Sequence, residues 1–458
     1  MGTLRRDGAS VFASGYQYGL FPSVSAAWRI SGEKFMKGVT FINDLKLRYS
    51  WGKLGSYANV RGGNAYTLYA QSPGRSFYDW AGTSTNPAGG IYNNQIGNPS
   101  TTWESDIISN VGLDATLFHN KIDMSVEWFK KKVSGLLFSQ QASNIVVGGG
   151  NRPLVNIGNM QNTGIDANIT YHGGSARGLK YDLTGTFTSY NNKIVSIPGS
   201  GYFSTGGSRH GDLVRNQVGQ AVGAFYGYEV LGLFQSDEDV SKSPTQSGAA
   251  PGRFKFRDIS GADGKPDGKI DANDRTFFGN PNPDFTYGLN ISVSYKNFDF
   301  STFLFGSYGN DLLNYTKYFT DFPQLFKGGI RREAAVNAWR PDNTISKIPK
   351  LEFASGFSTT ENNSTYFLEK GSYLRDKQMQ VGYTLPNSGL TRFGIDRLRV
   401  YIQAANLFTI TKYSGLDPEL QSVNPNAGAN DPAQVTFGID YGNYPHQRSF
   451  IVGVNLGF

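Results

Sequence analysis

The residues of this chain with the clearest chemical potential lie in one acidic stretch, from Asp263 to Asp274. It has carboxylates at positions 1, 5, 9 and 12, glycine at position 6 and isoleucine at position 8, which is the spacing of a calcium-binding loop. Such loops wrap hard oxygen ligands around one cation, while the glycine permits a sharp turn. The pattern indicates calcium as a cofactor, held by Asp263, Asp267, Asp271 and Asp274.

Lys265 occupies the third position of this stretch, where a calcium loop places a ligand oxygen. An ammonium group at that point would repel the cation. Two interpretations therefore stay open, a calcium loop and a solvated acidic turn.

Catalytic residues are not indicated anywhere in the sequence. The four histidines, His119, His172, His210 and His446, are isolated from one another, and no His-Glu-x-x-His or Gly-x-Ser-x-Gly spacing occurs. Carboxylates in the polar stretches are expected to be solvated. We predict a protein that is not an enzyme.

Aromatic residues in the polar stretches give a second candidate site. Tyr78, Trp80, Tyr226, Tyr228 and Phe234 would stack on sugar rings or pack against a covering protein. No residue pattern identifies the substrate, so the substrate-binding residues stay unknown at this stage.

Composition narrows the class of protein that holds these residues. The 458 residues include 57 glycines, 26 tyrosines and 32 phenylalanines but no cysteine, which favours strands and turns and excludes a disulfide scaffold. The net charge of +7 is spread without a Lys/Arg block, so nucleic-acid binding is not indicated. The sequence contains no stretch of about 20 apolar residues, so it does not predict a transmembrane helix. Residues 1–7 lack the apolar core of a signal peptide.

Strict alternation of apolar and small polar residues predicts strands along the whole chain. In Asp284–Lys296, six apolar side chains fall on one face in register, and Ser449–Phe458 ends the chain with the same rhythm. We count about eleven strands and a possible remnant near residues 3–13. The other expected strands lie near 21–30, 45–51, 111–117, 122–128, 165–171, 181–187, 298–306, 379–385 and 398–404.

The links between these strands alternate between short and long, and the long ones show no strand or helix pattern of their own. Long links are expected near 55–102, 134–159, 193–283, 310–372 and 411–447. A soluble sandwich has no reason to keep all its long loops at one end, whereas outer-membrane barrels have short periplasmic turns and long extracellular loops. We therefore predict an all-β, antiparallel transmembrane barrel.

Several segments, in order along nearly the whole chain, resemble the SusC-like members of the TonB-dependent outer-membrane transporters. Each segment is weakly specific alone, but together they are specific. The matching segments are 4–8, 21–30, 45–52, Asn156–Ile165, Gly279–Phe285, Tyr373–Arg375, Gly382–Pro386, Asn406–Phe408 and Asp417–Glu419.

The resemblance implies a 22-stranded barrel filled by an amino-terminal plug. It further implies a location in the outer membrane, a SusD-like lipoprotein as partner, oligosaccharides or peptides as substrate, and energy delivered through TonB. Residues 1–458 would be the carboxyl-terminal part of that barrel, with 11–12 of its strands.

The sequence departs from the family's pattern because it lacks the plug, the TonB box and a signal peptide. We therefore expect a fragment that does not transport alone, since an open sheet would leave unpaired edges in hydrocarbon. The alternative hypothesis is a secreted or surface β-rich adhesin that binds glycans without transport.

Overall fold

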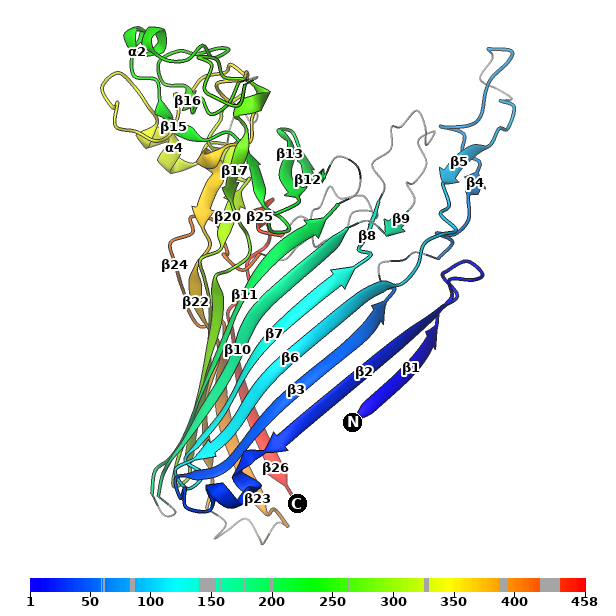
Figure 1. Ribbon diagram of the computed structural model, residues 1–458. Coiled ribbons are helices and arrows are strands. Elements are labelled where there is room, and N and C mark those ends of the chain that lie inside the picture. Colours follow the sequence, from blue (N-terminus) through cyan, green and yellow to red (C-terminus); the bar gives the residue numbers. More distant parts are fainter. Residues whose placement is uncertain are drawn as a thin grey trace.

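A computed structural model gives the fold (Figure 1). It describes residues 1–58, 60, 62–82, 87–139, 154–156, 158–175, 178–197, 199, 201–261, 263–324, 329–386, 392, 394–420 and 437–458.

Twelve long strands form one antiparallel sheet, in which each strand pairs with the next long strand of the chain. This confirms the predicted fold class and places a strand at the expected remnant, although most strands are longer than predicted. The strands are β1 Gly2–Gly8, β2 Tyr18–Arg29, β3 Ile42–Ser56, β6 Glu104–Leu117, β7 Ile122–Ser134, β10 Asn159–Gly174, β11 Lys180–Ser196, β18 Phe285–Tyr295, β19 Phe298–Tyr308, β22 Tyr373–Thr384, β23 Arg397–Ala405 and β26 Ser449–Gly457, with β24 Thr409–Thr411 beside β22.

One face of this sheet is apolar and uncovered. On β26 the side chains of Phe450, Val452, Val454 and Leu456 are more than half exposed, and each pairs with an apolar residue of β23. A soluble protein rarely exposes so large an apolar surface, whereas the lipid-facing band of an outer-membrane barrel requires it. We call this the lipid face, and the opposite, polar face the lumen face.

Short turns join the strands at one end of the sheet. The turn between β6 and β7 uses left-handed backbone at three successive residues, Phe118, His119 and Asn120, and Lys121 N–H closes it on Leu117 O at 3.0 Å. The link between β2 and β3 at this end carries two 3-10 helices, η1 Ile30–Gly32 and η2 Lys34–Met36. The predicted alternation of short and long links is therefore confirmed.

Glycine–tyrosine pairs fix the register of neighbouring strands. A side chain at Gly453 would come within 2.3 Å of the Tyr401 ring, to which it is directly opposite, and Gly306 and Tyr287 form the same arrangement. Because only glycine fits beneath each ring, a slip of the strands is disfavoured.

The long links are not structureless, in contrast to the expectation from their sequence. Residues from three of them pack together as a lobe at the end of the sheet opposite the short turns (Figure 1). Its strands are β12 Tyr202–Ser208, β13 Gly211–Gln217, β14 Phe225–Gly227, β15 Val230–Leu233, β16 Phe254–Phe256, β17 Thr276–Gly279, β20 Asp311–Asn314, β21 Leu368–Lys370 and β25 Ile439–Asp440.

Short helices complete this outer lobe, namely α2 Asp237–Lys242, η3 Ala272–Asp274, α3 Lys317–Thr320, α4 Arg332–Asn337 and η4 Thr365–Phe367. Two further strand pairs lie in other long links, β4 Leu68–Ala70 with β5 Tyr92–Gln95 and β8 Leu137–Ser139 with β9 Leu154–Asn156. In the described part of the chain, no helix is both long and apolar enough to cross a membrane.

The core of the outer lobe is aromatic. Phe225, Phe234, Phe254, Phe256 and Phe367 are almost completely buried in it. Burying one phenylalanine side chain stabilises the folded state by about 1.5–3 kcal/mol. Several such side chains together explain how links with no strand pattern of their own form a defined fold.

Candidate functional site

Arg48 is the centre of a charged network on the lumen face. Its guanidinium donates to both carboxylate oxygens of Asp114, at 2.7 and 2.9 Å, and to Glu127 Oε2 at 3.0 Å. Lys46 adds a second cation 3.1 Å from Asp114. Gly112 makes room for the network, because a side chain there would come within 2.8 Å of the Arg48 guanidinium. The network joins β3, β6 and β7 across their polar sides.

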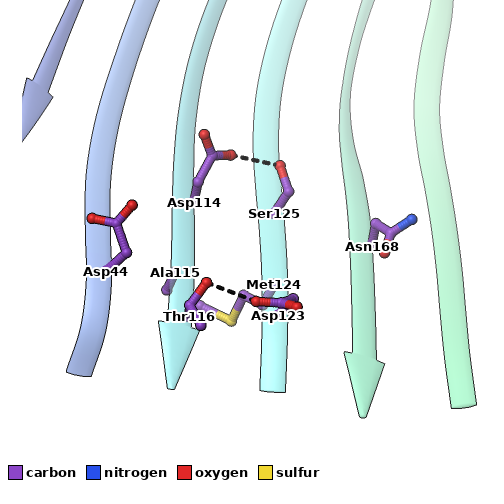
Figure 2. A pocket seen from close by; sticks show the side chains of 8 residues that line it. All are labelled: Asp44, Asp114, Ala115, Thr116, Asp123, Met124, Ser125 and Asn168. Atoms are coloured by element: carbon purple, nitrogen blue, oxygen red, sulfur yellow. Dashed lines mark hydrogen bonds between the residues drawn. The ribbon is translucent and has the colours of Figure 1, made fainter. Parts of the chain in front are cut away.

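A hollow of about 230 Å³ lies beside this network, toward the short turns. Asp44, Asp114 and Asp123 line it (Figure 2), together with the neutral polar residues Thr116, Ser125 and Asn168. Figure 2 shows two of the carboxylates accepting hydrogen bonds, Asp123 from Thr116 at 2.7 Å and Asp114 from Ser125 at 2.9 Å. The hollow is suited to donor groups of a segment that packs against the lumen face.

His172 is not isolated, in contrast to the expectation from the sequence. Its two ring nitrogens lie 2.6 Å from Asp182 Oδ1 and 3.0 Å from Asp123 Oδ2, so the ring joins three strands. The strand register could have indicated this contact from the sequence, because His172 and Asp182 lie directly opposite each other on β10 and β11. The contact links β7, β10 and β11 as a cross-strand brace.

A buried ion cluster joins β22 to the link that follows β24. Arg375, with only 3% of its side chain exposed, donates to Asp417 at 2.5 Å and to Glu419 at 2.7 Å, while Lys377 also contacts Glu419. Burial opposes the charge on Asp417, but backbone N–H groups of His446 and Glu419, and then Arg375, lower its pKa below the usual value. Two of the segments that carried the family resemblance are thus ion-paired to each other.

The acidic stretch forms a turn in which its carboxylates accept backbone hydrogen bonds. Asp263 accepts from Lys265 N–H at 3.1 Å and Asp267 from Lys269 N–H at 3.0 Å. Asp271 caps η3, accepting from Asn273 N–H at 2.7 Å.

Asp274, the twelfth residue of the stretch, is fully buried. It accepts from the N–H groups of Ile259 at 2.7 Å, Ser260 at 3.1 Å and Asp271 at 2.8 Å. Among the residues that the structure describes, no three His, Asp or Glu side chains gather in a group that could hold a metal ion. Calcium binding by Asp263, Asp267, Asp271 and Asp274 stays a prediction.

Asp274→Ala is expected to destabilise the outer lobe by about 1–3 kcal/mol in the presence of EDTA, because three backbone donors lose their acceptor. Hydrogen exchange of residues 254–279 in the intact protein measures the effect, with Asp263→Ala, at the exposed end of the turn, as the matched control. A Ca²⁺-dependent rise in protection that Asp263→Asn removes would support the calcium loop. Equal protection with and without Ca²⁺ would leave only the acidic turn.

The candidate aromatic residues divide into two groups. Tyr228 is buried in the core of the outer lobe and Phe234 is also buried, so neither side chain is available to a ligand. Tyr226 packs against Phe277 and Arg215. Trp80, by contrast, is 83% exposed and lies edge-on to the exposed Tyr78, with ring centroids 5.0 Å apart. Of the five candidate aromatic residues, Tyr78 and Trp80 are thus the exposed pair.

His210 is buried in an aromatic box of the outer lobe. Its ring centroid lies 4.3 Å from that of Tyr318, 5.0 Å from Phe367 and 5.4 Å from Tyr315. Burial lowers the pKa of His210 from 6.5 to about 4. The imidazole is therefore neutral at physiological pH and acts as a packing residue.

The stability of the outer lobe is expected to fall as the pH drops from about 6.5 to about 4. In that window the unfolded chain takes up a proton at His210 that the folded lobe excludes, which costs up to about 1.4 kcal/mol per pH unit. Hydrogen exchange between pH 4 and 7 should show a shallower loss in His210→Phe than in the wild type. His119→Gln, in an exposed turn, is the control, and an unchanged pH slope in His210→Phe would contradict the assignment.

Comparisons with known proteins find relatives along the whole chain. TonB-dependent receptor P3 of Formosa agariphila is 32% identical, and TonB-dependent receptor SusC of Bacteroides thetaiotaomicron is 30% identical, each over 100% of this chain. The chain spans 43% and 42% of these two receptors, which is less than half of their length. No profile of a known protein family matches the chain.

A solved structure of the RagAB peptide transporter has the same fold, with a TM-score of 0.78 and 24% sequence identity over 100% of this chain and 45% of that chain. The strand order and the outer lobe thus belong to a fold already seen in that structure. With relatives named as receptors along its full length, this chain belongs to the SusC-like TonB-dependent receptors of the outer membrane.

Proposed function

We propose that this chain is part of a TonB-dependent importer that takes oligosaccharides or peptides across the outer membrane together with a SusD-like lipoprotein. The single observation that carries the proposal is the outer lobe, a separately packed body built from three long links at one end of a barrel sheet. A barrel that only anchored a protein would not need so large a folded structure at its outer mouth. A lobe in this position suits the binding of a partner and the capture of a substrate.

The lumen face supports the same function. The network around Arg48 and the hollow lined by Asp44, Asp114 and Asp123 present donors and acceptors to whatever fills the barrel. In the proposed receptor, a plug would pack against this face, and its displacement would open the route for the substrate. Hydrogen bonds between the plug and the lumen face would be replaced by hydrogen bonds to water when the plug moves, so the net free-energy cost of displacement would be small.

Within that receptor, residues 1–458 are proposed to form the carboxyl-terminal barrel portion. TonB would be contacted through a part of the receptor outside this sequence. The substrate class is proposed from the relatives, one of which is described as a peptide transporter while another is SusC.

The proposed role is not enzymatic. The relatives are named as receptors or transporters, and the polar clusters described above serve as cross-strand and loop contacts. The alternative, a surface adhesin that binds glycans without transport, receives no support from these relatives.

Uptake by cells that carry the full-length receptor tests the proposal. Deleting its gene should abolish growth on the oligosaccharide or peptide mixture that it imports, and an uncoupler of the proton gradient should stop uptake while leaving surface binding intact. A SusD-like lipoprotein should co-purify with the receptor in detergent. Binding that persists with no energy-dependent uptake of any tested oligosaccharide or peptide would favour the adhesin instead.

A further inference from the structure

Four lysines form a cluster on the lipid face near the outer ends of the strands. Lys53, Lys132 and Lys193 belong to a single row across the sheet, in which Ile107 and Gln161 stand between them. Lys130 lies one pleat closer to the middle of β7. We call these four residues the lysine row.

The register shows that the lysine row faces lipid. Lys131 points to the lumen, where it contacts Asp106 at 2.7 Å, so its neighbours Lys130 and Lys132 point the other way. Lys132 lies opposite Ile107 and Gln161, and these in turn lie opposite Lys53 and Lys193. Residues directly opposite one another share a face, so all four ammonium groups belong to the lipid face.

The height of the lysine row matches the boundary between hydrocarbon and headgroups. Tyr171, an exposed aromatic residue of the short-turn end, lies opposite Ile122, at the level where a barrel has an aromatic girdle. From Ile122 to Lys132 the strand rises about 33 Å, or about 25 Å along the membrane normal at a tilt near 40°. An apolar band is about 25 Å tall, so Lys132 stands at its outer limit. Trp128, just below, supplies the interfacial aromatic ring expected at this level.

The lysine row has no anionic partner within the described protein. None of its four members has a carboxylate within 4 Å among the described residues, and Lys132 and Lys193 are exposed. Ser109, Gln161 and Thr163, which lie beside these lysines on the same face, are neutral. Neighbouring lysines are separated by about 7–10 Å, so four like charges repel one another unless an anion lies between them.

We propose that the lysine row binds the phosphate groups of an anionic lipid headgroup in the outer leaflet. Long lysine stems let the ammonium groups reach outward from the apolar band, and each lysine near an anionic membrane surface adds to the attraction. The serine, threonine and glutamine side chains between the lysines supply further donors to phosphate oxygens. Bound lipid would hold the outer ends of β3, β7 and β11 in place beneath the outer lobe.

The test uses the full-length receptor in detergent, with diphosphorylated lipid A as the probe. A variant with Lys53, Lys130, Lys132 and Lys193 all replaced by Gln is expected to bind this lipid at least about tenfold more weakly. The matched control replaces Lys34, Lys37, Lys121 and Lys180, at the short-turn end, by Gln and should bind as the wild type does. Heat-modifiable mobility shows that each variant is folded.

A second variant keeps the test decisive if the Gln variant does not fold. Replacing the same four lysines by Arg should keep binding, since charge rather than the ammonium itself is required. Equal loss in the short-turn control, unchanged binding in the folded Gln variant, or lost binding in a folded Arg variant would each overturn the proposal. So would full competition by inorganic pyrophosphate, which would identify free phosphate as the ligand.

Discussion

Arg375→Met is expected to destabilise the packing of residues 409–420 on β22 by about 3–5 kcal/mol, because it leaves the buried carboxylate of Asp417 and the partly buried carboxylate of Glu419 without their main cation. Asp417 is only 5% exposed, so water cannot replace the guanidinium. Lys377 still contacts Glu419, but it does not contact Asp417. Hydrogen exchange and limited proteolysis at residues 409–420 of the full-length receptor measure the loss.

Two further variants separate loss of charge balance from loss of packing. Arg397→Met removes an exposed arginine of the neighbouring strand and should change little. Combining Arg375→Met with Asp417→Asn and Glu419→Gln removes the stranded charges and should recover more than half of the lost stability, since apolar or neutral replacements of a buried ion cluster are often tolerated. A triple variant no more stable than Arg375→Met would show that the arginine contributes mainly through shape.

The sheet could be predicted from the sequence because lipid and lumen impose a period of two on every strand. Val452, Val454 and Leu456 alternate with the small or polar Gly453 and Asn455, because one face of the strand contacts hydrocarbon and the other contacts the wet lumen. Strand ends were less predictable. β10 and β11 continue well past the alternating part, into mostly polar residues in which the apolar signal disappears.

The outer lobe could not be predicted in the same way, because its contacts join residues far apart in the chain. Asn363 donates to the carbonyl oxygens of Leu213 and Tyr226, 150 and 137 residues away. Neither partner belongs to a local pattern, and an asparagine in a polar link looks like a surface residue. The same holds for Tyr228 and Phe234, whose sequence context suggests contact with a sugar or a covering protein but whose side chains are buried.

The charged sites could be predicted only in part from the sequence. Arg48, Asp114 and Glu127 come from three strands, and their proximity follows from register once the strands are paired. The acidic stretch was found by its spacing, yet spacing does not reveal that Asp274 is buried beneath three backbone donors. Spacing identifies a loop that turns sharply, while side-chain direction decides what the loop binds.

Phe225→Ala is expected to open the outer lobe at a cost of about 3–5 kcal/mol, because its fully buried ring would leave a cavity in the aromatic core. The ring packs closely against two other segments, since side chains added at Gly279 and Gly438 would come within 2.9 and 3.2 Å of it. Hydrogen exchange of residues 202–279 measures the opening. Phe353→Ala, which removes an exposed ring of the same type, is the matched control and should be nearly neutral.

The same variant separates the roles of the lobe and the barrel. The strand ladder of the sheet and the lipid face do not depend on Phe225, so heat-modifiable mobility should be unchanged while co-purification of the proposed lipoprotein partner falls. If the partner still binds to a receptor whose lobe has opened, the binding surface lies elsewhere on the outer links. If the variant also loses heat-modifiable mobility, loss of packing in the lobe unfolds the barrel strands as well. The lobe would then be a structural part of the barrel rather than a separable receptor surface.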